Sequence, residues 1–413
     1  MQLSDSEQAL RDGTAGEAAR RAVDMQIKVG DFFGAERFVP ISSAHVMADS
    51  EALGEIGIRF LEELAEIGAK FSVPTTINPR GADFLHFQTL GQSDDVVAQE
   101  RRIVAAFEKL GALAVNTCIN YESITPPRFG EHLAWGDTGT VIFANSVAGA
   151  RSNFEGGPVA VAAAITGRTP AYGFHLDQQR RATVNVEVQA VPKEPSDWGA
   201  IGCWIGRQVS DYWQVPALTG LDGQPSITEL KQLGASLASY GSLAMFHLVG
   251  VTPEAPTLAA AGGGREPARK IVMPPDGIEQ AYRSFQPESE QPDLVVFSAP
   301  QLSLVEIRRI ADLLAGRPVH SGVQLLLTTN HAYRSLAERL GFVAQIERSG
   351  GLVLEDVCFY ILHARELGQK NHWRTLVTDS AKLANIVAGY GYNPVLRPTA
   401  ICVEAAVTGR LPW

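Results

Sequence analysis

Three short polar segments follow predicted strands, and their side chains are of kinds that bind small polar molecules. Residues 42–50 contain serines, a histidine and an aspartate, residues 74–79 contain threonines and an asparagine, and residues 116–121 contain asparagines and a cysteine. In parallel α/β sheets, ligands bind beyond the carboxyl ends of the strands. Three polar loops in equivalent positions therefore predict one polar pocket, although each loop taken singly could be an ordinary capped turn.

The four cysteines, Cys118, Cys203, Cys358 and Cys402, lie far apart in the sequence. No Cys-X-X-Cys pair and no dense cysteine framework occurs, which disfavours a structural zinc site and a disulfide scaffold. The sequence also lacks dinucleotide-binding, P-loop, nucleophile-elbow and zinc-protease motifs. The cysteines are therefore either core residues or members of a site that the fold assembles.

The charge and hydropathy of the chain exclude several classes of protein. The net charge is −10 over 413 residues, which argues against nucleic-acid binding but not against a small anionic ligand. No stretch of about 18 apolar residues occurs, so no membrane-spanning helix is expected. The polar, acidic N-terminus is unlike a secretory signal, and the cysteine usage fits a reduced setting. We therefore expect a cytoplasmic protein.

Elements that could position these residues follow from hydrophobic periodicity and cap signals. The pattern predicts alternating helices and strands, and therefore an α/β fold with several αβα layers and largely parallel sheets. A first region, 1–255, is separated from a second, 271–413, by a predicted Gly- and Pro-rich linker over 256–270. The predicted strands are 37–42, 71–76, 113–118, 294–298, 323–329 and 353–362, and the main predicted helices are 17–29, 52–67, 96–110, 304–314 and 332–340.

A long ordered series of motifs covers nearly the whole chain: Gly34–His45, Val73–Pro79, Arg128–Asp137, Ala144–Pro158, Thr166–His175, Thr378–Lys382 and Cys402–Ala406. In this order the motifs resemble the large, catalytic subunit of the aconitase X family. The resemblance implies an aconitase-like fold and a hydro-lyase that dehydrates a small hydroxy acid. Family members act on cis-3-hydroxy-L-proline or on phosphomevalonate and need a smaller swivelling unit, fused or separate. Because this chain stops at Trp413, a separate small subunit is expected.

The resemblance also implies an iron centre held at three places, which in this sequence are Cys118, Ser298 and Cys358. The second position is a cysteine in the family and a serine here. A neutral hydroxyl is a poorer ligand for soft iron than a thiolate. The site could therefore hold an altered iron–sulfur cluster, a mononuclear iron or no metal. Cys203 and Cys402 fall outside the family's ligand positions and are predicted to be core residues.

By the same resemblance, several loops are expected to contact the substrate. Ser50 is expected in a catalytic role, and Arg151 or Lys382 could supply positive charge, while the base is expected on the small unit. The expected substrate-binding residues are Ala48, Asp49, Ser50, Asn78, Pro79, Asp137, Thr138, Asn145 and Ser146.

Asp49 bears on the choice of substrate. A carboxylate there would repel a phosphate but could pair with a ring ammonium, which favours the dehydration of cis-3-hydroxy-L-proline to pyrroline-2-carboxylate. Asp49 could instead simply cap the helix that begins near Glu51. The alternatives are a phosphomevalonate dehydratase, or a diverged paralogue with a different reaction or with ligand binding alone.

Overall fold

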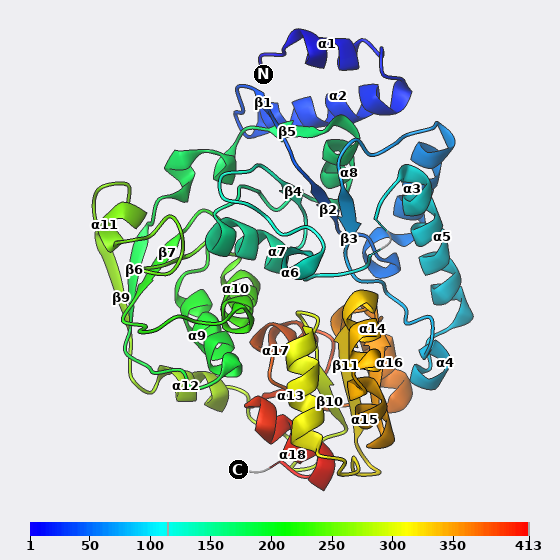
Figure 1. The fold of residues 1–413 in the computed structure, drawn as a ribbon, viewed down its shortest axis with the longest axis vertical. Helices are drawn as coiled ribbons and strands as arrows, with labels where there is room; N and C mark the ends of the chain where they lie inside the picture. The colour runs from blue at the N-terminus through cyan, green and yellow to red at the C-terminus, as the bar shows by residue number, and fades with distance from the viewer. Residues whose placement is uncertain (114, 412–413) are drawn as a thin grey trace.

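The structure is a computed structural model that describes residues 1–113 and 115–411. Its chain forms three neighbouring regions, each built on a parallel sheet (Figure 1). In the view of Figure 1 the first region is blue to teal at the top and right, the second is green at the left, and the third is yellow to red at the bottom. The predicted α/β class with several largely parallel sheets is confirmed.

The first region carries a three-stranded parallel sheet in the order β3-β2-β4, and a separate antiparallel pair of β1 with β5. The long helices α2, α3, α5 and α8 provide its apolar faces. Its elements are α1 (Asp5–Arg11), α2 (Glu17–Phe32), β1 (Phe38–Pro40), β2 (Ala44–Val46), α3 (Ser50–Glu66), β3 (Thr75–Ile77), α4 (Phe87–Leu90), α5 (Asp94–Leu110), α6 (Asn120–Ser123), β4 (Ala134–Trp135), α7 (Thr138–Phe143), η1 (Ala144–Ala148), α8 (Gly157–Thr166) and β5 (Arg168–Pro170).

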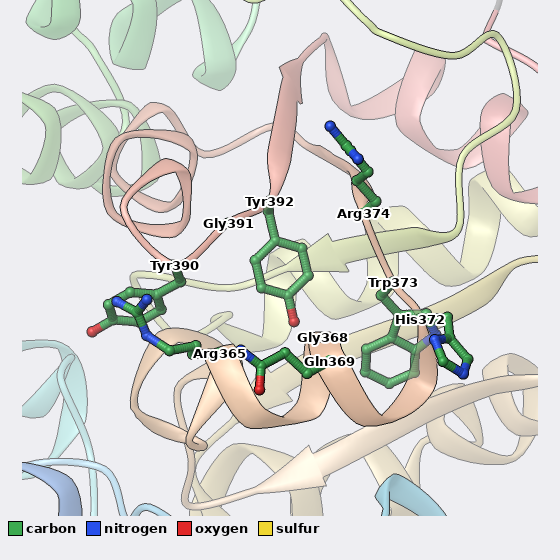
Figure 2. Close-up of a pocket in the computed structure, with 9 residues that line it drawn as sticks. All are labelled: Arg365, Gly368, Gln369, His372, Trp373, Arg374, Tyr390, Gly391 and Tyr392. Atoms are coloured by element: carbon green, nitrogen blue, oxygen red, sulfur yellow. The ribbon is translucent and has the colours of Figure 1, made fainter.

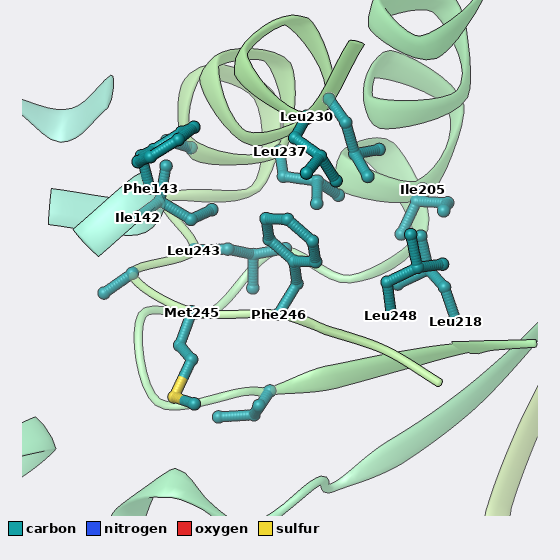
Figure 3. Packing of buried hydrophobic residues seen from close by; sticks show 14 of the residues in the cluster. Ile142, Phe143, Ile205, Leu218, Leu230, Leu237, Leu243, Met245, Phe246 and Leu248 are labelled. Atoms are coloured by element: carbon teal, nitrogen blue, oxygen red, sulfur yellow. The ribbon is translucent and has the colours of Figure 1, made fainter. Parts of the chain in front are cut away.

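The second region has four parallel strands in the order β8-β7-β6-β9. Its core crosses the border with the first region, because Ile142 and Phe143 of α7 pack with side chains of α9, α10 and β7 (Figure 3). Its elements are η2 (Gly173–His175), η3 (Asp177–Arg180), β6 (Val184–Val188), α9 (Pro195–Gln208), β7 (Pro216–Thr219), α10 (Ile227–Gly241), β8 (His247–Leu248), α11 (Leu258–Ala261), β9 (Arg269–Met273) and α12 (Gly277–Arg283).

The third region is a five-stranded parallel sheet in the order β12-β11-β10-β13-β14. Its strands are buried apolar runs, as expected for a sheet with helices on both faces. Its elements are β10 (Leu294–Phe297), α13 (Leu304–Leu314), β11 (Gln324–Thr329), α14 (His331–Arg339), α15 (Phe342–Arg348), β12 (Gly351–Glu355), η4 (Phe359–Ile361), α16 (Ala364–Asn371), β13 (Thr375–Thr378), α17 (Ala381–Ala388), β14 (Asn393–Leu396) and α18 (Thr399–Thr408).

The predicted linker over 256–270 differs from the structure. It contains α11 and the first two residues of β9, and β9 pairs with β6 inside the second sheet. Gly263 and Gly264 have positive φ and form the turn that joins these two elements. The glycine-rich composition therefore marks a tight turn within a region and not a flexible connection between regions.

Two predicted strands also differ in extent. The strand predicted over 71–76 is only β3, shifted to Thr75–Ile77, and the strand predicted over 353–362 ends at Glu355 and is followed by the turn η4. The strand predicted over 113–118 includes residue 114, which lies outside the described residues. Asn116 forms an isolated parallel bridge with Ile77, so part of this segment does lie beside β3.

Candidate active site

The polar loops of the first region meet at one edge of its sheet. Val46 pairs with Ile77 in parallel register, so the residues that follow β2 and β3 leave the sheet side by side. Asn116 joins them, since its side-chain amide donates to the Asn78 carbonyl at 2.9 Å. Asp137 follows β4, which pairs with the other side of β2. The sheet therefore gathers these loops at its carboxyl edge.

The third region supplies the opposite wall of this site. Ser298 follows β10 and Cys358 follows β12, and the Ser298 hydroxyl lies 3.4 Å from the Cys358 sulfur. Cys118 comes from the first region, and its thiol hydrogen-bonds to that of Cys358. The structure therefore brings together two cysteines that are 240 positions apart. Cys203 and Cys402 lie in separate hydrophobic clusters, as predicted.

Gln301 holds the cysteine-bearing loops in place. Its backbone N–H donates to the Cys118 sulfur at 3.2 Å, and its side-chain oxygen accepts the Cys118 N–H at 3.3 Å. Its side-chain amide donates to the carbonyls of Asn116 and Val357. One fully buried side chain thus joins the loops that carry both thiols. No sequence signal had indicated this role.

A buried cation lies beside the thiols. The Lys382 ammonium is 3.7 Å from the Asp137 carboxylate and 3.4 Å from the Thr138 hydroxyl. Burial lowers the pKa of Lys382, but Asp137 and the two thiols outweigh this effect and raise it. Burial raises the pKa of Cys118. For Cys358, burial is outweighed by hydrogen bonds from Cys118 and Ser298 and by the charge of Lys382, so its pKa is lowered.

Two soft sulfur donors and one hydroxyl face each other here. Among the residues that the structure describes, no three His, Cys, Asp or Glu side chains converge as a metal site. The Ser298 hydroxyl already contacts Thr328 at 2.7 Å and accepts the Phe359 N–H at 2.9 Å. The sulfurs fit a soft metal such as iron, and Ser298 fits better as a hydrogen-bonding neighbour than as a third strong ligand.

Asp49 takes one of the two roles that the sequence left open, since it caps a helix. Its Oδ1 atom caps α3 by accepting the Ala52 N–H at 2.9 Å, while its Oδ2 atom is buried without a partner. Burial raises the pKa of Asp49 to about 7. The Asn78 side chain is also fully buried, and both of its polar atoms lack partners. Because buried polar groups are normally paired, these atoms indicate a place for a ligand.

Three predicted residues lie outside this group. Arg151 bonds to Asp177 and to the His175 carbonyl near the start of β4, whereas the loops meet at its end. The Asn145 side chain bonds to the carbonyls of Ser152 and Ala244, and the Ser146 hydroxyl accepts the Phe246 N–H. Asn145 and Ser146 therefore bond to backbone here, and Arg151 bonds to a backbone carbonyl and to Asp177. In contrast, Ala48 and Pro79 lie on the converging loops, and Thr138 begins α7 directly after Asp137.

Sequence reasoning missed several polar residues around the site. Arg80 follows Asn78 and Pro79, stacks on Phe84 and lies 3.7 Å from the Asp356 carboxylate. Glu100 and His363 both contact Ser50. Glu100 had a detectable signal, because it occupies the apolar face of α5 between Val97 and Ile103. His363 had none, because it lies in a loop 313 positions from its partner.

Family models match the chain in three parts. The first domain of aconitase X matches residues 1–178, the second matches 182–283 and the third matches 292–408. The chain belongs to the aconitase X family. The three matched domains coincide with the three sheets, and the candidate site lies between the first and the third.

Relatives of the chain are dehydratases of two kinds. It is 38% identical over 94% of both chains to the phosphomevalonate dehydratase large subunit of Methanothermobacter thermautotrophicus. It is 35% identical to the cis-3-hydroxy-L-proline dehydratase of Pseudomonas aeruginosa, over 99% of this chain and 70% of that protein. The crystal structure of the holo-form of Thermococcus kodakaraensis aconitase X matches with a TM-score of 0.88 and 33% identity, over 98% and 100% of the two chains. This aconitase X chain is therefore an enzyme of the hydro-lyase class.

Every helix within residues 1–113 and 115–411 is too short or too polar to cross a membrane.

Proposed function

We propose that this aconitase X chain dehydrates cis-3-hydroxy-L-proline to pyrroline-2-carboxylate. The observation that carries the proposal is Asp49, whose Oδ2 atom is buried and unpartnered at the edge where the loops meet. An ammonium of the substrate would pair with this carboxylate and favour its charged form. The relative in Pseudomonas aeruginosa that bears this activity in its name supports the same substrate.

The alternative substrate is phosphomevalonate, which the 38% identity to a phosphomevalonate dehydratase large subunit favours. The charges around the loops weigh against it. Asp49 and Glu100 are both buried beside Ser50, and the nearby cation Arg80 already faces Asp356. A phosphate placed next to two carboxyl groups would be repelled, or would require both to be protonated.

Different residues of the chain are proposed to bind the substrate, stabilise its negative charge and hold the metal centre. Asn78 is free to hydrogen-bond the substrate, and the Lys382 ammonium would stabilise negative charge that develops on the substrate carboxylate. Cys118 and Cys358, with Ser298 beside them, would hold an iron or iron–sulfur centre. When bound, that centre would supply a Lewis acid for the departing hydroxyl group.

We further propose that a separate small subunit completes the enzyme. The relatives named as large subunits support this, since the chain spans 94% of the one from Methanothermobacter thermautotrophicus. The Pseudomonas protein carries additional sequence beyond the matched part, because this chain covers 70% of it. The proton acceptor for the Cα–H bond is proposed to lie on that subunit.

The test is a side-by-side assay of the chain with its small subunit on both acids. The proposal expects dehydration of cis-3-hydroxy-L-proline and little turnover of phosphomevalonate. The variant Asp49→Asn keeps a capping side chain on α3 but removes the charge. Because hydrogen bonds to charged groups contribute about 1.5–3 kcal/mol, kcat/KM on hydroxyproline should fall by roughly 10- to 150-fold.

The control is the melting temperature of the variant, which should stay close to that of the parent chain. Turnover of phosphomevalonate with none of hydroxyproline would overturn the substrate assignment. If kcat/KM is unchanged in Asp49→Asn, the Asp49 carboxylate does not contribute to substrate recognition.

A further inference from the structure

A carboxylic acid is buried in the apolar face of α5. Glu100 is fully buried, and its helix neighbours on that face are Val97 and Ile103. Its Oε1 atom accepts the Ser50 N–H at 2.6 Å, and its Oε2 atom has no partner. Burial raises the pKa of Glu100. The group is thus suited to holding a proton next to the substrate loop.

Ser50 connects this carboxyl group to a histidine. The Ser50 backbone N–H donates to Glu100 Oε1 at 2.6 Å, the Ser50 side chain also interacts with this carboxyl group, and the Ser50 hydroxyl lies 2.9 Å from His363 Nε2. Gly81 makes this approach possible. A Cβ atom at position 81 would lie 2.6 Å from Glu100 Oε1 and 3.1 Å from Ser50 Oγ, closer than packed atoms tolerate.

His363 lies nearer the protein surface than Ser50 and Glu100. It is half-buried and precedes α16 with a φ of 54°, a left-handed conformation that is uncommon for a residue other than glycine. Two residues later, Arg365 lines a cavity of about 400 Å³ between α16 and the segment 390–392 (Figure 2). His363 is thus partly exposed to solvent, whereas Glu100 is fully buried.

We propose that Glu100, Ser50 and His363 form a proton relay between the substrate pocket and solvent. The inference rests on the proposed function, because dehydration removes one proton from carbon and delivers one to the departing hydroxyl group. As the Glu100 carboxyl proton passes to Ser50 Oγ, the Ser50 hydroxyl proton passes to His363 Nε2. The imidazolium then releases its Nδ1 proton to water, which leaves a carboxylate at Glu100 and one hydronium ion. The reverse sequence reloads the acid.

The charges that face the relay come from several elements. Asp49 is next to Glu100, and Glu51 is close to His363, Arg365 and Glu366. Tyr390, which lines the cavity, is close to Asp49 and Glu51. Any pH dependence of the relay will include these groups, so the first test follows the Glu100 proton itself.

The first experiment is a pH jump on the full chain with its small subunit, followed by infrared spectroscopy. The carbonyl band of the protonated Glu100 side chain is identified by its absence in Glu100→Gln. The relay predicts that His363→Asn, which tolerates the left-handed backbone, slows deprotonation of this band at least tenfold with unchanged amplitude. Equal rates in the parent and His363→Asn, or no band that depends on Glu100, would overturn the relay.

The second experiment separates the relay from a purely structural role of Glu100. In Glu100→Gln the amide oxygen still accepts the Ser50 N–H, so a structural role predicts unchanged kinetics. The relay predicts a kcat at least tenfold lower, with KM within twofold. Gly81→Ala should also lower kcat, because the added Cβ would push Glu100 and Ser50 apart. Gly322→Ala, where a Cβ meets only ordinary contacts, should leave kcat unchanged. If no hydroxy acid is dehydrated, the proposed function fails, and the infrared experiment still decides on the relay.

Discussion

At the scale of single residues, the two thiols determine whether the site can hold a metal. Cys118 and Cys358 share one hydrogen bond, and Gln301 fixes the loops on which they lie. We expect Cys118→Ala or Cys358→Ala to reduce the iron bound per chain at least tenfold in protein purified without oxygen, because one remaining thiolate is a weak site. The measurement is iron analysis of each purified variant.

Cys203→Ala provides the matched control, since Cys203 is also buried but lies in a separate hydrophobic cluster. Its iron content should equal that of the parent chain. Full iron retention in the double variant of Cys118 and Cys358 would show that the metal is bound elsewhere.

The same scale shows what the sequence could reveal about the site. Motifs and strand ends predicted that Asp49, Asn78, Cys118 and Cys358 lie on ligand-binding loops, and the structure brings these residues together. Arg151 was predicted from its motif alone, and a motif does not tell which end of a strand a residue occupies. Glu100 and His363 meet through Ser50, and no sequence spacing encodes a contact between a helix face and a distant loop.

At the scale of elements, a glycine of α9 allows this helix to pack closely against α10. A Cβ atom at Gly202 would lie 2.7 Å from the Leu233 carbonyl oxygen and from Ser236 Cβ, so the two helix backbones approach closely there. We expect Gly202→Ala to lower the free energy of unfolding by about 1–3 kcal/mol, because overpacking outweighs the gain in helix propensity. Urea denaturation measures the change.

Gly199 in the same helix supplies the comparison. A Cβ atom there would be 3.5 Å from Ser236 Oγ, an ordinary contact. Gly199→Ala should therefore raise the free energy of unfolding by up to about 1 kcal/mol. If both variants changed stability in the same direction, the close approach of the helices at Gly202 would not be the cause.

Elements with their own end signals were the easiest to predict. The helix predicted over 304–314 begins after the capping box of Ser303 with Glu306. Strands of two or three residues, such as β4, are too short to show an alternating pattern. Their positions depend on pairing with other strands, which the sequence pattern does not report.

At the scale of the whole molecule, one lysine links all three matched domains. Lys231 of α10 is fully buried, 3.4 Å from Glu122 of the first domain and 2.5 Å from Glu306 of the third. Burial lowers the pKa of Lys231, but these two carboxylates outweigh that effect and raise it. Lys231→Met would leave both carboxylates buried without a cation, which should cost about 3–5 kcal/mol.

An exposed lysine offers the contrast for this experiment. Lys270 pairs with Glu187 on the surface, and such pairs contribute less than about 1 kcal/mol. Urea denaturation of Lys270→Met should therefore resemble that of the parent chain. A similarly small effect of Lys231→Met would mean that the domains are not joined through this cation.

The α/β class and the parallel sheets followed from alternating helices and strands, and the structure confirms both. The strand order β12-β11-β10-β13-β14 did not follow, because hydrophobic periodicity indicates that a strand is buried but not which strand lies beside it. The boundary between regions was also misplaced at the glycines, where a turn and a linker have the same composition.

The position of Lys231 also sets a condition on how the nascent polypeptide matures. Glu306 is translated 75 residues after Lys231, so until then Glu122 is the one carboxylate of this pair that the ammonium can contact. Multidomain chains often fold one domain at a time as they leave the ribosome. Here the contact that joins all three domains can form only after much of the last one has been made, so this step of maturation comes late and involves all three domains together.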